Sequence, residues 1–129
     1  MEKRAFSPWK WQKERSYVQA VEVKNSTGTL YCSGQAAIDE NGVSSNEEMK
    51  LQLQQAISNL EEVITSSGYE CGGIVRLNIY TTSTAELWPH FPILQEWIAK
   101  HNIEQALTML EVNGLFETLK VELEATVIK

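Results

Sequence analysis

Alternation between apolar and polar residues predicts β-strands in several segments of the chain. The alternation is strict in residues 17–24 and 73–83, and it continues in 105–113 and 118–129. One face of the last segment carries only apolar side chains, namely Leu119, Val121, Leu123, Ala125 and Val127. We expect that face to lie in the hydrophobic core.

A turn separates the first strand from the second. Residues 25–28 read Asn-Ser-Thr-Gly, and we expect Gly28 to take a positive φ there. A second apolar strand follows at 29–35, so the two strands are predicted to form an antiparallel hairpin. A loop with its tight point at Asn41-Gly42 comes next.

Apolar residues recur with a helical period after that loop. They form one stripe that consists of Met49, Leu53, Ala56, Ile57, Leu60, Val63 and Ile64. Ser45 and Glu48 make a capping-box pattern before it, and Gly68 ends it. Gln52 falls on the opposite, polar side of this predicted helix.

A second helical stretch runs to about residue 101, and its apolar face consists of Phe91, Leu94, Trp97 and Ile98. Ser83 and Glu86 form another capping-box pattern at its start. Proline inside a helix costs roughly 3 kcal/mol. We therefore expect an irregular turn first and a regular helix from about Pro89.

The predicted order is β-β-α-β-α-β-β, which indicates an α+β fold with two helices on one face of a mixed sheet. We expect one domain over residues 1–129, with 1–16 as an N-terminal arm or edge segment. The other sheet face collects Arg76, Asn78, Tyr80, Lys120, Glu122 and Glu124. That face is too polar for a second helical layer, so we expect it to contact other copies of the chain, and ligand sites favour such junctions.

Composition narrows the class of protein. The chain has 129 residues, of which 43% are hydrophobic, enough for one core. It shows no secretory signal and no apolar run near the roughly 20 residues of a membrane helix, so we expect a cytoplasmic protein without membrane contact. Cys32 and Cys71 lack CxxC spacing and are expected to be reduced thiols. His90 and His101 would stand about 16 Å apart on one helix, too far to share a metal. We predict no metal and no cofactor.

The net charge of −6 is unevenly distributed. Residues 1–15 carry a positive net charge, and the rest of the chain is strongly acidic. An acidic body repels phosphate backbones, so nucleic-acid binding is not expected. The basic segment at the N-terminus is interpreted as a solvated edge.

The short run Ser33-Gly34-Gln35 ends the apolar strand "LYC" with small and polar residues. Together with "YVQAVEV", "NLEEVITSSGYECGGIV" and the terminal "VELEATVI", it makes the chain resemble the RidA/YjgF family from Tyr17 onward. The resemblance implies a chorismate-mutase-like protomer and a homotrimer whose three sheets close into a barrel. It also implies three equivalent clefts between subunits, each binding a small molecule.

The resemblance assigns ligand-binding positions to Tyr17, Ser33, Gly34, Thr108 and Glu122. Glu122 matches the glutamate thought to hold the attacking water, and a structural ion pair is the alternative role for it. The family holds a substrate carboxylate with an arginine, and in "EQALTMLEV" that position is Leu107. Leucine offers no charged partner to a carboxylate.

The segment Ser7-Pro8-Trp9 resembles a branch of the family without that arginine. Arg15 is a candidate replacement for the missing cation, although an exposed arginine needs no such role. Leu107 with Trp9, Trp11 or Phe116 is a candidate apolar pocket for a neutral ligand.

Several functions remain open at this stage. The first is a metabolite-binding trimer that is not a usual 2-iminobutanoate/2-iminopropanoate deaminase. The alternatives are an imine or enamine deaminase, which is a hydrolase, with an altered substrate, and an RNA-cleaving or translation-inhibiting protein. A scaffold trimer with inactive clefts is the fourth.

Overall fold

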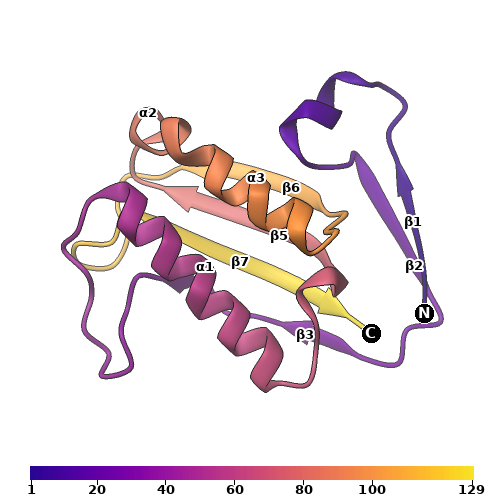
Figure 1. Cartoon of the computed structure of the whole chain (residues 1–129), viewed down its shortest axis with the longest axis horizontal. Coiled ribbons are helices and arrows are strands. Elements are labelled where there is room, and N and C mark those ends of the chain that lie inside the picture. The colour runs from indigo at the N-terminus through magenta and orange to yellow at the C-terminus, as the bar shows by residue number, and fades with distance from the viewer.

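Two long helices cover one face of a five-stranded sheet, and a separate two-stranded sheet stands at one end of the molecule (Figure 1). The structure is a computed structural model that describes residues 1–129. This arrangement confirms the predicted α+β protomer with two helices packed on a mixed sheet. None of its helices is both long enough and apolar enough to cross a membrane.

The main sheet has the order β3-β7-β5-β6, with the short β4 also paired to β7. Its strands are β3 (Thr29–Tyr31), β4 (Gln35–Ala36), β5 (Ile74–Thr81), β6 (Ala106–Glu111) and β7 (Val121–Ile128). Only β5 and β6 are parallel. One edge of the sheet is therefore β3 and β4, and the opposite edge is β6.

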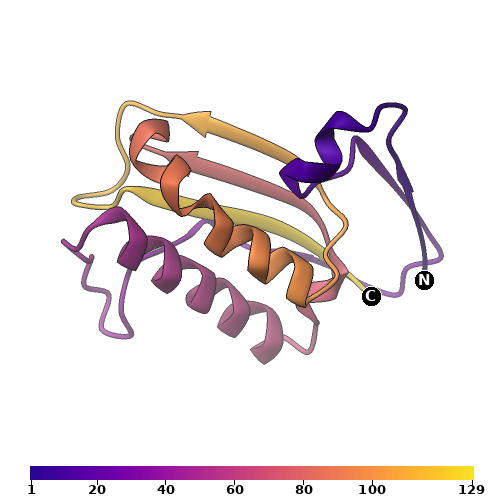
Figure 2. The same cartoon turned by 45° about the horizontal axis from the view of Figure 1, so that its top comes forward.

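The helices lie side by side over the same sheet face (Figure 2). They are α1 (Met49–Ser66) and α3 (Phe91–Lys100), the latter preceded by the single turn α2 (Thr84–Leu87) and the 3-10 turn η3 (Trp88–His90). The predicted apolar face of α3 is buried. Ser83 Oγ accepts a hydrogen bond from the Glu86 amide at 3.1 Å, as its capping pattern predicts.

The start of α1 differs from the prediction. Glu48 is the N-cap residue, and Ser45 Oγ accepts from the Glu47 amide in a turn ahead of the helix. Gln52, expected on the polar side, is fully buried. Its Nε2 donates to the carbonyl oxygens of Ser45, Glu47 and Thr118, and its Oε1 accepts from the Lys120 amide. Gln52 therefore connects α1 by hydrogen bonds to the loop ahead of it and to residues 118–120, which lead into β7.

The predicted hairpin is wrong. The first alternating segment forms β2 only at Ala20–Lys24, and its partner is β1 (Glu2–Phe6), the other strand of the small sheet. β3 pairs with β7 instead. The start of the segment is paired elsewhere. The Val18 amide donates to the Gln105 carbonyl at 3.1 Å, and Val18 forms an isolated parallel β-bridge with Ala106 at the start of β6. Residues 17–18 are thereby held at the β6 edge.

The turn between β2 and β3 also differs in detail. Asn25, not Gly28, takes the positive φ, at 54°. Gly28 instead packs against the Tyr69 side chain, where a Cβ atom would clash with the phenol. Gly42, at the predicted tight point of the loop, and Gly68, after the end of α1, take positive φ values of 80° and 83°.

Candidate ligand-binding cleft

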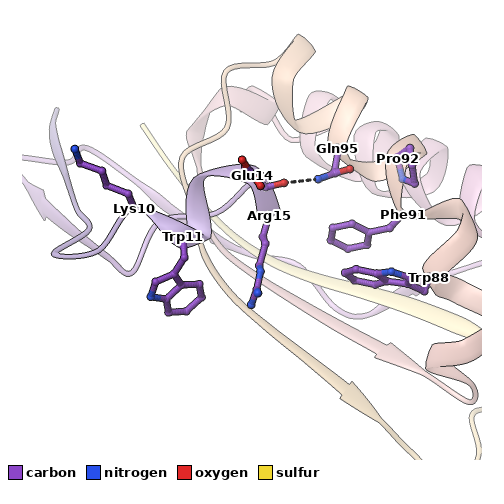
Figure 3. A pocket seen from close by; sticks show the side chains of 8 residues that line it. All are labelled: Lys10, Trp11, Glu14, Arg15, Trp88, Phe91, Pro92 and Gln95. Atoms are coloured by element: carbon purple, nitrogen blue, oxygen red, sulfur yellow. Dashed lines mark hydrogen bonds between the residues drawn. The ribbon is translucent and has the colours of Figure 1, made fainter.

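A cleft lies between the 3-10 helix η1 (Trp11–Arg15) and the segment from η3 to α3 (Figure 3). Two glutamines hold η1 in place. Gln95 Nε2 donates to the Glu14 carbonyl at 3.0 Å, and the buried Gln105 donates to the Ser16 carbonyl at 2.7 Å. Ser16 then turns the chain with φ 63° and ψ 40°, a left-handed conformation that L-residues rarely adopt. Arg15 and Tyr17 consequently line the cleft from either side of this turn.

Aromatic rings form most of the cleft walls. Trp88 and Phe91 stack with ring centroids 5.2 Å apart on one side. Trp11 lies edge-on to Tyr17 at 6.4 Å on the other side. Trp88 and Trp11 are 58% and 50% exposed, although large aromatic side chains are usually buried. Clustered exposed rings of this kind mark ligand or protein interaction sites.

The cleft contains two adjoining cavities that share Arg15, Trp88 and Phe91. One has a volume of about 500 Å³ and is lined by Arg15, Tyr17, Trp88, Phe91, Leu107 and Met109. The other, of about 620 Å³, extends toward Lys10 and Gln95. We call the first the aromatic cleft. Neither cavity is lined by a histidine or a cysteine.

Arg15 supplies the positive charge of the aromatic cleft. Its Cζ lies 5.0 Å from the centre of the Trp11 ring, a cation–π distance. Figure 3 shows its side chain reaching between Trp11 and the stacked pair of Trp88 and Phe91. The guanidinium thus lines the same cavity as Leu107, which carries no charge.

A second group of predicted site residues lies toward the other side of the sheet, where β4 pairs with β7. Ser33 and Gly34 form the break between β3 and β4, and Glu122 on β7 pairs with Ala36. A Cβ atom on Gly34 would lie 2.5 Å from Cδ of Glu122. The carboxyl group of Glu122 therefore lies directly over the Gly34 backbone. We call Ser33, Gly34 and Glu122 the Glu122 group.

One protomer does not bring the predicted site residues together. Leu107 pairs with the core residue Leu77, so its side chain lies on the helix side of the sheet, in the aromatic cleft. Thr108 points to the opposite face, where its hydroxyl accepts a hydrogen bond from Arg76 at 3.0 Å. Strand β5 separates Glu122 on β7 from β6, the strand that carries Leu107, and Ser33 and Gly34 lie one strand further away, beyond β7.

The polar sheet face carries its own hydrogen-bond network. Asn78 Nδ2 and the Tyr80 hydroxyl both donate to Oε1 of Glu124, at 2.9 and 3.1 Å. The hydrogen bond to Glu124 raises the pKa of the Tyr80 phenol. Asn78 Oδ1 is buried and has no hydrogen-bond partner within the chain. A buried amide oxygen without a donor is costly, and a donor from water or from another molecule would satisfy it.

Sequence reasoning found only part of the aromatic cleft. Leu107 was expected beside Trp9, Trp11 or Phe116, but its cavity is completed by Trp88, Phe91 and Met109. Phe116 does not line it. Trp88 begins η3 and is exposed, and nothing in the pattern of the sequence singled it out as a site residue.

Comparisons with known proteins point to one family. The sequence profile described as "Endoribonuclease L-PSP" matches residues 10–129. A RutC family protein of Buchnera aphidicola is 27% identical over 114 residues, which cover 88% of this chain and 86% of that protein.

Solved structures show the same fold. YyfB of Yersinia pestis, a Rid family protein of unknown function, matches with a TM-score of 0.78 and 27% identity over the full length of both chains. The YjgF gene product of E. coli matches with a TM-score of 0.71 and 23% identity, covering 88% of this chain and 87% of that one. TdcF of E. coli, solved with bound serine, has a TM-score of 0.72 and 18% identity over the same shares.

Proposed function

This chain belongs to the endoribonuclease L-PSP family of RidA/YjgF and RutC proteins, and from that premise we propose that it binds a small metabolite between subunits of a homotrimer. The observation that supports this most is the separation of the predicted site into two halves, one at the β6 edge and one where β4 pairs with β7. Because each half is open within a protomer, a neighbouring chain is needed to bring the aromatic cleft and the Glu122 group together.

The polar sheet face supports the trimer. No helix covers it, and its residues still form an ordered network around Glu124. The buried Asn78 oxygen without a donor fits a face that meets other copies of itself. In a ring of three such chains, the β6 edge of one sheet meets the β3 and β4 edge of the next.

The walls of the aromatic cleft indicate the kind of ligand. Tyr17, Trp88, Phe91, Leu107 and Met109 offer apolar and aromatic surface, and only Arg15 offers a full charge. A small molecule with a flat or apolar body suits that surface. Leu107 stands at the position of the family arginine, so this protein belongs to an arginine-less branch in our proposal. The usual deaminase chemistry is not inherited.

A second candidate is an imine or enamine deaminase that binds its substrate through Arg15. The specific observation is that Arg15 and Leu107 line one cavity. A guanidinium pairs with a carboxylate through two parallel hydrogen bonds. Glu122 of the neighbouring chain then holds the attacking water in this candidate.

The oligomer is tested first. Sedimentation equilibrium is expected to give three times the chain mass of 14.6 kDa. A monomer at micromolar concentration contradicts the proposal, because each half-site then stays open.

Ligand binding is tested by thermal shift against small carboxylic acids, amides and aromatic compounds. We expect a saturable hit that is weakened at least tenfold by Tyr17→Phe or Glu122→Gln. Arg15→Gln separates charged from neutral ligands, and Arg4→Gln is its matched control, because Arg4 stacks on Phe6 away from the cleft. A trimer that binds none of these compounds contradicts the proposal in favour of a scaffold.

The deaminase candidate needs its own assay. An amino-acid oxidase generates the imine, and semicarbazide traps whatever survives. Loss of trapped imine that depends on Arg15 and Glu122 supports this candidate. No acceleration at stoichiometric protein rules it out and leaves binding as the function.

A further inference from the structure

Three metal-ligand side chains from different elements meet beside the end of α3. Glu61 lies in α1, Cys71 begins the 3-10 turn η2 (Cys71–Gly73), and His101 directly follows α3. One ligand atom of each lies within 4.8 Å of the other two. His101 Nε2 is 2.9 Å from Glu61 Oε1. We propose that Glu61, Cys71 and His101 form a zinc-binding site that clamps α1, η2 and α3 together.

Glycines allow the Cys71 loop to approach this position. A Cβ atom on Gly72 would lie 3.0 Å from the carbonyl oxygen of His101, closer than nine in ten real Cβ contacts. A Cβ atom on Gly73 would clash with the carbonyl oxygen of Ile128. The Cys-Gly-Gly turn is therefore wedged between the end of α3 and β7, which keeps Cys71 near His101.

Trp97 holds the carboxylate of Glu61. Its indole Nε1 donates to Glu61 Oε1 at 2.6 Å, and its ring lies edge-on to the His101 ring at 5.9 Å. Hydrogen-bond donors of this kind orient metal ligands from outside the coordination shell. The other carboxylate oxygen, Oε2, remains free to coordinate.

The donor set favours zinc over magnesium or calcium. A thiolate and an imidazole suit Zn²⁺, whereas Mg²⁺ and Ca²⁺ prefer oxygen ligands. Zinc bonds of about 2.0–2.3 Å place tetrahedral ligand atoms roughly 3.3–3.8 Å apart. The separations, all within 4.8 Å, must therefore change by up to about 1 Å on binding. Side-chain rotations can supply this, because Glu61 and His101 remain 37% and 27% exposed.

Coordination moves protons in a defined way. The Cys71 thiol releases its proton to water and binds as thiolate. His101 Nε2 gives up its contact with Glu61 Oε1, any proton on Nε2 passes through water to Nδ1, and the freed Nε2 lone pair binds the metal. Burial raises the pKa of the Cys71 thiol to about 11, and the charge of Glu61 adds to this rise, so the thiol stays protonated without a cation. With three protein ligands, water takes the fourth position.

The site has access to solvent and stands apart from the aromatic cleft. A cavity of about 520 Å³ lies beside it, lined in part by Tyr69, Gly72 and His101. None of its three ligands lines the aromatic cleft. Because the unfolded chain holds no such cluster, zinc binding would stabilise the folded protein by mass action.

The test titrates chelator-treated, phosphine-reduced protein with Co²⁺ and then with Zn²⁺. We expect one Co²⁺ per chain, a thiolate-to-cobalt charge-transfer band, its loss when Zn²⁺ replaces Co²⁺, and a higher melting temperature. Cys71→Ser and His101→Gln are expected to abolish the band or to weaken binding at least tenfold. The chain's other cysteine and histidine provide the controls, and Cys32→Ser and His90→Gln should bind as the wild type does.

Cys71 is buried, so its serine variant is first compared with the wild type by circular dichroism. If that variant unfolds, His101→Gln and Glu61→Gln decide the outcome, since both side chains reach solvent. A wild type without the charge-transfer band overturns the proposal. So does a His101→Gln variant that binds Co²⁺ as tightly as the wild type, or a band that depends on Cys32, because the metal then lies elsewhere.

Discussion

The carboxyl group of Glu122 occupies the space that a side chain at Gly34 would fill, with only 2.5 Å between Glu122 Cδ and a Cβ atom built on Gly34. The glycine between β3 and β4 is thus matched to a residue of the same chain. It leaves the Glu122 carboxylate lying flat on the strand end, where the proposed site needs it.

Gly34→Ala is expected to displace the Glu122 side chain from its rotamer, at a cost of about 1 kcal/mol. Urea unfolding measures this cost. Gly114→Ala is the matched control, because nothing lies within 4 Å of a Cβ atom there. The cost should largely disappear in the double variant Gly34→Ala/Glu122→Ala, since the two residues are coupled. Equal costs with and without Glu122 would show that the two side chains do not compete.

Gln52→Leu is expected to lower the free energy of unfolding by about 3 kcal/mol, because it leaves buried backbone groups unpaired. The affected groups include the Lys120 amide, which donates to Gln52 Oε1 at 2.9 Å. Gln54→Leu, at an exposed position of the same helix, should change stability by less than about 0.5 kcal/mol. Similar losses in the two variants would mean that leucine itself, not the lost network, destabilises α1.

Gln52 also shows where sequence reasoning stops. Periodicity placed α1 and its apolar stripe correctly, because burial of one helix face follows directly from residue type. It assigned Gln52 to the solvent side, since an amide is usually exposed. Only the neighbouring chain segments, with their unpaired carbonyls and amide, make burial of this amide favourable. Those segments are far apart in the sequence.

The small sheet shows a different limit. Alternation marked residues 17–24 as a strand but carried no information about its partner. Adjacency in sequence suggested a hairpin with 29–35, whereas β2 pairs with β1 and β3 pairs with β7. The resemblance to a family supplied the fold and the candidate positions. It did not show that Leu107 and Thr108 face opposite sides of the sheet.

Acid is expected to weaken the contact between Glu111 and Thr84. The Thr84 amide and hydroxyl donate to Glu111 Oε1 at 2.7 and 3.1 Å, and these hydrogen bonds lower the pKa of Glu111. A lowered folded-state pKa contributes stability above the ordinary glutamate pKa, and that contribution is lost as pH falls through the folded value. An NMR titration of the Glu111 carboxyl carbon should show this lowered pKa. It should rise in Thr84→Ala, which keeps the amide but loses the hydroxyl; an unchanged pKa would discount the hydroxyl contact.

Asn78→Asp is expected to raise the dissociation constant of the proposed trimer at least tenfold, which corresponds to about 1.4 kcal/mol. The substitution places a second carboxylate where Asn78 Nδ2 now donates to Glu124, on the face where three sheets meet in the proposal. Sedimentation velocity over a dilution series measures the change. Asn46→Asp adds the same charge at an exposed position and should leave association unaltered. A trimer equally stable in both variants would place the interface elsewhere.

Purified protein is expected not to cleave RNA, despite the description of its family. The net charge of −6 opposes binding of a polyanion, and the basic residues are concentrated near the N-terminus. A fluorescent RNA substrate incubated before and after a further purification step tests this. Cleavage that survives purification and falls with added salt would reverse the conclusion.

The docking of η1 has a consequence for how selectivity can evolve in this protein. One wall of the aromatic cleft comes from a short N-terminal segment, which two glutamine side chains attach to the rest through backbone carbonyls. Because the acceptors are backbone carbonyls, these hydrogen bonds do not depend on which side chains the segment carries. Substitutions at Trp11 and Arg15, which line the two cavities, can therefore change the recognised compound without changing the hydrophobic core.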